Sequence, residues 1–170
     1  MKQAEKFGRP VITLVNTPGA YCGIGAEERG EGEAIARSIM EMARLEVPII
    51  SIFIGEGGSG GALALAVADE VWMLENAVYS ILTPEGYASI LWRDNSKAPE
   101  AALLMKLEAS DLYKMGIIDR IIQEKEPITK NDMKKVCTVL ERHISNFLIR
   151  YSKKSTTYIV NERYQKFRKY

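Results

Sequence analysis

The stretch IGEGGSGGALALAVADE, residues 54–70, joins a run of β-forming residues to a run rich in alanine and leucine. Five glycines fall within seven residues of it, interrupted only by Glu56 and Ser59. Residues 48–54, before the glycines, are apolar at nearly every position, which is typical of a strand covered on both faces in a parallel sheet. Residues 59–68 are typical of a helix. We therefore expect a strand that turns sharply into a helix at the glycines.

A second β-rich run lies upstream, at residues 11–15, and ends in turn-forming residues at 16–19. Between the two predicted strands, residues 26–45 carry apolar side chains at helical spacing. Several glutamates crowd the start of that segment, where they suit the helix dipole. The two strands and the helix between them form one βαβ unit.

The rest of the chain continues this alternation. Thr83 is predicted to cap a helix with Pro84 at its first position and Glu85 in its first turn, running to Trp92. Further strands are expected at 70–74, 78–82 and 117–123, and further helices at 98–107, 108–115, 131–150 and 154–168. The sequence shows no repeat or linker. We predict a single α/β domain over residues 1–170, in which residues 131–170 form a helical tail.

Composition is that of an ordinary globular protein, with 170 residues of which 46% are hydrophobic and 26% charged. Lysine and arginine number 23 against 22 aspartates and glutamates, so no overall charge favours nucleic acid or a membrane surface. Cys22 and Cys137 lack the CxxC spacing of a zinc site or a disulfide framework. No apolar run reaches the roughly 18 residues that span a bilayer. We expect a cytoplasmic protein without a metal of its own.

The glycine run has three interpretations, of which the first is a hydrolase. Residues 57–61 fit the pattern G-x-S-x-G, with Ser59 as the nucleophile at a strand-to-helix turn. A catalytic triad also needs a base, and His143 is the single histidine. It lies in a predicted helix between Leu140 and Phe147, where a histidine more often packs than catalyses. A serine hydrolase therefore depends on one poorly placed residue.

The second interpretation is a phosphate-binding loop. The P-loop pattern requires a lysine followed by serine or threonine after its last glycine, whereas Gly61 is followed by alanine and leucine. The other glycine cluster, within residues 19–25, precedes a helix expected to begin with Glu27 and Glu28. Their carboxylates would repel a phosphate from that helix terminus. Neither cluster favours a nucleotide.

The third interpretation needs only the backbone. Glycines let a ligand approach the main chain closely because they have no Cβ. The first amides of a helix have no intrahelical partner, and the helix dipole adds to their positive potential. Such a turn can serve as an oxyanion hole, in which the loss of one donor typically costs about 10²–10³ in rate. The alternative is that the glycines only allow close packing of the helix on the strand.

Several motifs in order resemble the carboxyltransferase α subunits of bacterial acetyl-CoA carboxylases. They are NTPGAY at 16–21, GAEERG at 25–30, GEGGSGGALA at 55–64, PEG at 84–86 with ASILW at 88–92, and RYQKFRKY at 163–170. The similarity covers essentially the whole chain. It implies a crotonase-like fold, which is a spiral of ββα units, with a C-terminal helical extension.

The resemblance also implies transfer of carboxylate from carboxybiotin, held on a carrier protein, to acetyl-CoA, giving malonyl-CoA for fatty acid synthesis. It implies that the amides of Gly60 and Gly61 stabilise negative charge on the ureido oxygen of biotin. Tyr21 is expected either in the biotin pocket or as a packed aromatic. The residues expected to line the biotin site are Gly57, Gly58, Gly19, Ala20, Tyr21, Pro84, Glu85 and Gly86.

The partners implied by the resemblance are a zinc-ribbon carboxyltransferase β subunit, the biotin carboxyl carrier protein and biotin carboxylase. The expected assembly is α2β2 or a homo-oligomer, with acetyl-CoA held on the side of the β chain. Cys22 and Thr83 stand where the family usually has proline and serine. Family members also carry a substantial region before the position of Met1, so we expect exposed apolar surface and an unpaired sheet edge. A non-catalytic assembly or regulatory partner of the β subunit is the alternative function.

Overall fold

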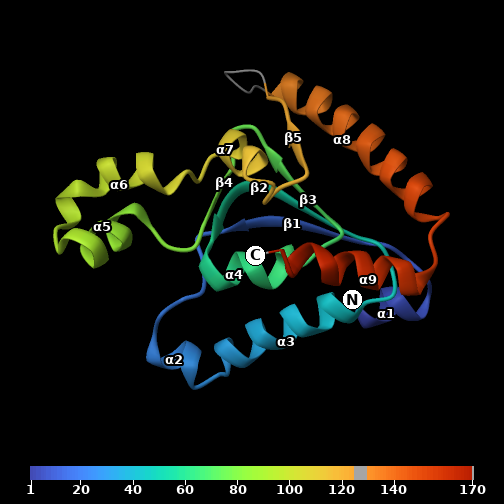
Figure 1. Ribbon diagram of the computed structural model, residues 1–170, viewed down its shortest axis with the longest axis horizontal. Helices are drawn as coiled ribbons and strands as arrows, with labels where there is room; N and C mark the ends of the chain where they lie inside the picture. Colours follow the sequence, from blue (N-terminus) through green and yellow to red (C-terminus); the bar gives the residue numbers. More distant parts are fainter. Residues whose placement is uncertain (125–129, 170) are drawn as a thin grey trace.

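The centre of the molecule is a parallel β-sheet, seen edge-on in the ribbon of Figure 1. The computed structural model describes residues 1–124 and 130–169, apart from the side chains of 130 and 131. Within that part of the chain the strand order is β1-β2-β3-β5, and β4 pairs with β2. The strands are β1 (Val11–Thr17), β2 (Ile49–Gly58), β3 (Glu70–Leu74), β4 (Val78–Ser80) and β5 (Arg120–Ile122). This α/β arrangement confirms the predicted fold class.

Helices lie on both sides of the sheet. In Figure 1, α3, α4 and α9 lie below it, α8 lies to its upper right, and α5 and α6 project to the left. The helix bounds are α1 (Lys2–Lys6), α2 (Ile24–Glu27), α3 (Glu31–Arg44), α4 (Ser59–Ala66), α5 (Pro84–Trp92), α6 (Ala98–Met105), α7 (Ala109–Lys114), α8 (Lys130–Tyr151) and α9 (Thr156–Phe167), with a 3₁₀ turn at Asn95–Lys97. Among the described residues no helix is long and apolar enough to cross a membrane.

The predicted βαβ unit is present as β1, α3 and β2, but its helix differs from the expectation. The sequence predicts one helix over 26–45, whereas the structure has two, α2 and α3, separated at Gly30. Gly30 has φ +76°, a left-handed conformation that most residues disfavour, and it serves as the N-cap of α3. Helix α2 has ended at Glu27, and Gly30 begins a new helix inside the segment that the sequence predicts as one.

Strand β2 continues four residues beyond the predicted end at residue 54. Its earlier part pairs with β3, and its last residues pair with β4 through Glu56–Val78, Gly57–Tyr79 and Gly58–Ser80. Three of the five glycines therefore belong to the strand. A Cβ on Gly57 would lie 2.2 Å from the Phe53 ring, so the absent side chain makes room for that aromatic residue.

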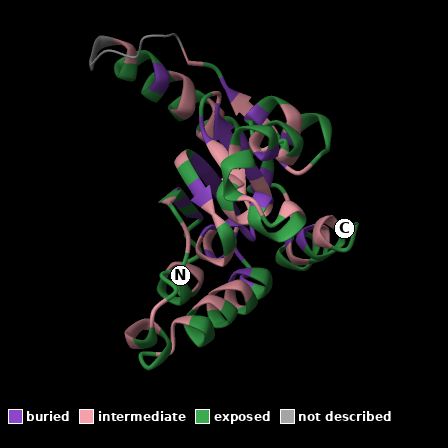
Figure 2. Cartoon of the chain, turned by 90° about the vertical axis from the view of Figure 1, so that its left-hand side faces the viewer, coloured by how far each residue is buried: buried purple, intermediate pink, exposed green. Residues whose placement is uncertain are grey.

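The core lies between the sheet and its helices, where buried residues concentrate in Figure 2. Thr13 of β1 and Ser51 of β2 point toward α4, because both hydroxyls donate to the carbonyl oxygen of Leu65. The opposite face of β1 is open, and Ile12 and Leu14 are 42% and 60% exposed. This agrees with the expected exposed apolar surface, and among the described residues β1 pairs only with β2 and so lies at an edge of the sheet.

Helix α9 is attached to the sheet by a buried ion pair between Arg163 and Asp69. Both side chains are almost completely buried, and the guanidinium forms two hydrogen bonds of 3.0 and 2.9 Å to the carboxylate. Its remaining donors reach the carbonyl oxygens of Met42, Leu45 and Val47. One arginine thus joins α9 to the end of α3 and to the segment that enters β2.

Candidate functional site

The turn between β2 and α4 has the features expected of an anion-binding helix start. Helix α4 begins at Ser59, and its N-cap, Gly58, is extended and has no capping side chain. The first turn of α4 contains no acidic residue. The leading amides of the helix have no intrahelical partner, so they are available to a ligand. The dipole of α4 favours a negative charge at this point.

Ser59 is held in a strained backbone conformation. Its φ is +53°, in the left-handed region that residues with a Cβ adopt at an energetic cost. The neighbouring positions explain how the strain is maintained, because the turn packs directly on the loop that follows β1. A Cβ on Gly58 would lie 2.1 Å from the carbonyl oxygen of Pro18, and one on Gly61 would lie 2.9 Å from the carbonyl carbon of Gly19. Close backbone packing therefore requires glycine at 58 and 61.

Gly60 is different from its neighbours. A Cβ there would contact only the side chain of Ile35 in α3, at 3.6 and 3.7 Å, which is ordinary van der Waals contact. Gly60 does not have a positive φ, so its backbone conformation does not require glycine. Close packing thus accounts for Gly58 and Gly61, whereas neither packing nor backbone conformation explains Gly60.

The loop after β1 has its own internal order. The hydroxyl of Thr17 lies 3.3 Å from both the amide nitrogen and the carbonyl oxygen of Gly19, whose φ is +125°. The amide of Tyr21 donates to the Glu31 carboxylate at 2.9 Å. The Tyr21 side chain is 75% exposed, so the structure does not make it a packed core aromatic.

A cavity of about 610 Å³ opens beside the start of α4. Ser59 and Gly60 form one wall, and the remaining wall is mostly apolar. Its other lining residues are Leu63, Tyr79, Ser80, Ile81, Met105, Leu112, Met115 and Ile117. The sequence does not predict this wall, because the wall comes from β4, α6, α7 and the residues that follow α7. No local pattern signals that these elements meet.

Tyr79 provides a polar group within this apolar wall. Its ring lies against Phe53 with centroids 4.3 Å apart, which fixes it on the sheet. Burial raises the pKa of the Tyr79 hydroxyl, so that group is neutral and can donate a hydrogen bond at physiological pH.

The predicted site residues do not all meet at this cavity. Gly19 and Ala20 lie against Gly61, as the short distances at that glycine show. Pro84, Glu85 and Gly86 form the first turn of α5, where the Thr83 hydroxyl accepts from the Gly86 amide at 3.2 Å. Of the residues predicted for the site, Gly60 lines the cavity, whereas Gly57, Gly58, Gly61, the loop 19–21 and the turn 84–86 are not among its described lining residues.

Comparison with known proteins gives the family. The sequence profile described as "Acetyl co-enzyme A carboxylase carboxyltransferase-like" matches residues 1–170. The chain belongs to this family. Two relatives named acetyl-coenzyme A carboxylase carboxyl transferase subunit alpha, from Streptococcus equi subsp. zooepidemicus and Streptococcus pyogenes serotype M12, are 60% and 59% identical over all 170 residues. The chain spans 65% of the length of each.

Solved structures of low identity share the fold. Transcarboxylase 12S, with methylmalonyl-coenzyme A and methylmalonic acid bound, superposes with a TM-score of 0.71 at 21% identity, covering 89% of this chain and 29% of that one. A chain of a Pseudomonas malonate decarboxylase hetero-tetramer in complex with coenzyme A gives 0.73 at 19% identity, covering 95% and 66%. The carboxyltransferase-like family and its crotonase-like fold agree with the resemblance seen in the sequence.

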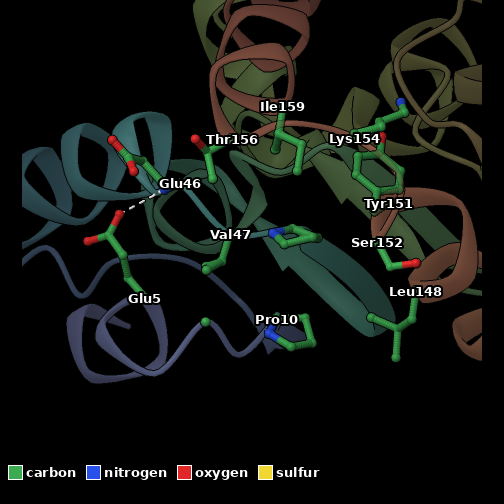
Figure 3. Close-up of a pocket in the computed structure, with 12 residues that line it drawn as sticks. Glu5, Pro10, Glu46, Val47, Leu148, Tyr151, Ser152, Lys154, Thr156 and Ile159 are labelled. Atoms are coloured by element: carbon green, nitrogen blue, oxygen red, sulfur yellow. Dashed lines mark hydrogen bonds between the residues drawn. The ribbon is translucent and has the colours of Figure 1, made fainter.

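A second cavity, of about 440 Å³, is drawn in Figure 3. It is lined by residues that precede β1 and β2, so it lies at the opposite end of these strands from the first cavity. Pro10, Val47 and Tyr151 are among its lining residues. Two of its charged side chains have partners, since Glu5 accepts from the Glu46 amide at 2.7 Å and Lys154 pairs with Glu162 outside the lining. The uncapped amides at α4 are absent from its lining, so the first cavity is the better candidate site.

The structure does not place His143 where it could act as the base of a serine hydrolase. His143 in α8 lies edge-on against Trp72, with ring centroids 6.2 Å apart. Trp72 pairs with Ile52 on β2, seven residues before Ser59, which corresponds to roughly 20 Å along a strand. Burial, followed by the charges of Arg120 and Arg142, lowers the pKa of His143. The structure thus makes His143 a packing residue on β3.

Among the described residues, no group of three or more histidine, cysteine, aspartate or glutamate side chains is placed to hold a metal ion. Cys22 and Cys137 are both exposed and unbonded to each other.

Proposed function

We propose that this chain forms the biotin side of an acetyl-CoA carboxylase carboxyltransferase, which moves carboxylate from carboxybiotin to acetyl-CoA to form malonyl-CoA. The observation that carries the proposal is the uncapped start of α4 beside an apolar cavity, in a chain whose entire length matches the carboxyltransferase-like family. The chain spans 65% of the length of its curated relatives, so the activity of the whole protein is part of the proposal.

The residues at the turn fit biotin in two ways. The amides of Gly60 and Gly61 lie at the positive end of the α4 dipole, where they can donate to the ureido oxygen. The apolar wall suits the hydrocarbon part of the ring system, and the wall has few charged groups to compete for the amides. Carboxybiotin on a carrier protein supplies the carboxylate.

These amides act on the charge that develops during transfer. Bound carboxybiotin would supply the carboxylate to the methyl carbon of acetyl-CoA and would accept the proton that this methyl group loses, so the transfer balances without a protein acid or base. The amides of Gly60 and Gly61 would hold the ureido oxygen and stabilise the negative charge that it gains as the carboxylate leaves.

The other predicted residues have supporting roles in the proposal. Gly57 and Gly58 carry the strand to the turn, and Gly19 and Ala20 form the backbone on which Gly61 packs. The exposed Tyr21 is available to a ligand that arrives from outside. Residues 84–86 contribute from the first turn of α5 when a partner or substrate bridges the two segments.

The proposed partners are a carboxyltransferase β chain that holds acetyl-CoA, the biotin carboxyl carrier protein and biotin carboxylase, acting in the cytoplasm. An assembly with two copies of each carboxyltransferase chain is proposed. The names of the structural neighbours describe a hexamer and a hetero-tetramer, which supports an oligomeric enzyme.

Gly60→Ala tests the proposal in the complete protein combined with its β chain. Decarboxylation of malonyl-CoA with free biotin as acceptor measures the reverse reaction. We expect kcat to fall about 10- to 100-fold, because the added methyl displaces the ligand from the amides. Stability should be unchanged or higher by up to about 1 kcal/mol, since alanine favours a helix and the site has room for a Cβ.

Gly32→Ala is the matched control, because a Cβ on that helical glycine of α3 meets nothing within 4 Å. It should gain similar stability and keep full activity. If folded wild-type protein binds the β chain but shows no turnover in either direction, the catalytic proposal is wrong and a non-catalytic assembly role is favoured.

The left-handed Ser59 at a strand-to-helix turn is the one observation that favours a serine hydrolase. That function predicts that a fluorophosphonate labels Ser59 covalently and that the Ser59→Ala variant is not labelled at this position. An unlabelled Ser59 in active protein eliminates it.

A further inference from the structure

The register between β1 and β2 changes just before the glycine turn. Val15 pairs with Phe53, but the next pair is Thr17 with Gly57. Two steps along β1 therefore correspond to four along β2, which leaves a bulge at residues 54–56. Bulges bend a strand and redirect the residues that follow it.

The side chain of Asn16 occupies the position opposite this bulge. Its Oδ1 accepts a hydrogen bond of 3.1 Å from the Glu56 amide. A Cβ on Gly55 would lie 2.6 Å from the same oxygen, so the bulge closes tightly around the side chain. Asn16 thus provides the acceptor that the regular ladder lacks at this point.

The bulge is also where β2 changes its neighbour. Residues up to Phe53 pair with β3, and from Glu56 the strand pairs with β4. The redirected residues 56–58 lead into Ser59, where α4 begins. The direction in which the leading amides of α4 point therefore depends on the geometry of the bulge.

The loop that follows Asn16 reaches the same turn from the other side. Pro18 and Gly19 pack on Gly58 and Gly61 with no room for a Cβ. Asn16 therefore joins the two segments that meet at the turn, because its backbone leads into the loop and its side chain holds the bulge.

We propose that Asn16 is a positioning residue for the amides of Gly60 and Gly61. It does not contact the substrate. It acts by holding the bulge of β2 in register, so that the turn at 58–61 docks on the loop 17–20 and directs the α4 amides into the cavity. The role of Asn16 in catalysis rests on the function proposed above.

The test compares Asn16→Ala, which removes the acceptor, with Asn16→Asp, which keeps an oxygen at the same position. Asn146→Ala on the exposed surface of α8 is the control. The complete protein with its β chain is assayed for decarboxylation of malonyl-CoA with free biotin. We expect Asn16→Ala to lower kcat about 10-fold or more, with KM for malonyl-CoA within about twofold of wild type.

Asn16→Asp should restore most of the rate, and Asn146→Ala should match wild type. A residue that only supports the fold would instead lower the melting temperature and the amount of active enzyme, and kcat per folded molecule would stay constant. The proposal is wrong if Asn16→Ala retains the wild-type kcat, or if the aspartate variant is as impaired as the alanine variant.

Amide hydrogen exchange gives a readout independent of activity. In Asn16→Ala, exchange across 56–58 and 78–80 should accelerate at least about fivefold, as expected when a hydrogen bond of about 1 kcal/mol is lost. Unchanged exchange there overturns the positioning role even in an inactive protein. If the wild type is inactive but exchange is accelerated in Asn16→Ala, the proposed reaction is wrong. The role of Asn16 in holding the bulge is then still supported.

Discussion

At the residue scale, the five neighbouring glycines have unequal reasons to be glycine. Gly58 and Gly61 pack against the backbone of the loop after β1, and Gly57 makes room for Phe53. Gly60 meets only a flexible isoleucine side chain at an ordinary distance. Gly55 is closed in by the Asn16 side chain, so packing explains glycine at four of the five positions. At Gly60 the explanation that we propose is the close approach of a ligand.

This difference predicts opposite effects on stability. Gly58→Ala places a methyl 2.1 Å from the carbonyl oxygen of Pro18, and two backbones must separate to accept it. We expect a loss of about 1–3 kcal/mol in the free energy of unfolding, as for an overpacked core. Urea denaturation measures the effect, with Gly60→Ala as the matched substitution. Equal stabilities of the two variants would contradict the packing role of Gly58.

At the element scale, the helix α5 shows how local chemistry sets a boundary. The sequence predicts Thr83 as an N-cap followed by Pro84, and the structure confirms both. The Thr83 hydroxyl accepts from the Gly86 amide, and proline at the first position loses no intrahelical hydrogen bond. These preferences operate within four residues, which is why they are visible in the sequence. The α3 boundary at Gly30 is equally local but falls within an apolar pattern that favours a longer helix.

Thr83→Ala should loosen the start of α5 without unfolding the molecule. Loss of the cap costs about 1 kcal/mol, and α5 projects from the body in Figure 1. Hydrogen exchange over residues 84–92 should accelerate, whereas exchange in β2 should remain as in wild type. Thr83→Ser keeps the hydroxyl and is the control. Exchange that accelerates throughout the sheet would show that α5 unfolds together with the core.

At the scale of the whole molecule, Arg163 connects the C-terminal helix α9 to the end of α3 and to the segments that enter β2 and β3. This residue of α9 pairs with Asp69 at the entrance to β3 and reaches three carbonyl oxygens near the end of α3 and the start of β2. Asp69 also accepts the Ile49 amide at 2.7 Å. A fully satisfied network of this kind couples α9 to the core, although its net contribution relative to an apolar pair is small.

Removing one partner leaves the other charge buried and unpaired. Arg163→Met should therefore lower the free energy of unfolding by about 3–5 kcal/mol. The double variant Arg163→Met, Asp69→Leu should be less destabilised than Arg163→Met alone, since it leaves no buried charge. Chemical denaturation of the four proteins forms a double-mutant cycle. A single variant as stable as wild type would show that α9 is not coupled to the core through this pair.

The sequence by itself determined much of the framework. The apolar strands, the helix between them, the cap at Thr83 and the glycine turn after β2 could all be predicted, because each depends on residues close together in the chain. The family was also recognisable, since its motifs are short and ordered. The sequence also favoured an anion site lined by backbone amides at the glycine turn, because the turn is rich in glycine and the chain offers no suitable base.

Only the tertiary structure decided which residues surround that turn. The wall containing Tyr79, Met105 and Met115 comes from elements 20 to 56 residues downstream of Ser59, and nothing local indicates that they meet it. The remote position of His143, the bulge held by Asn16 and the distinct role of Gly60 are likewise contacts between distant segments. They depend on how the strands pair and pack, and periodicity along a single chain does not encode that pairing.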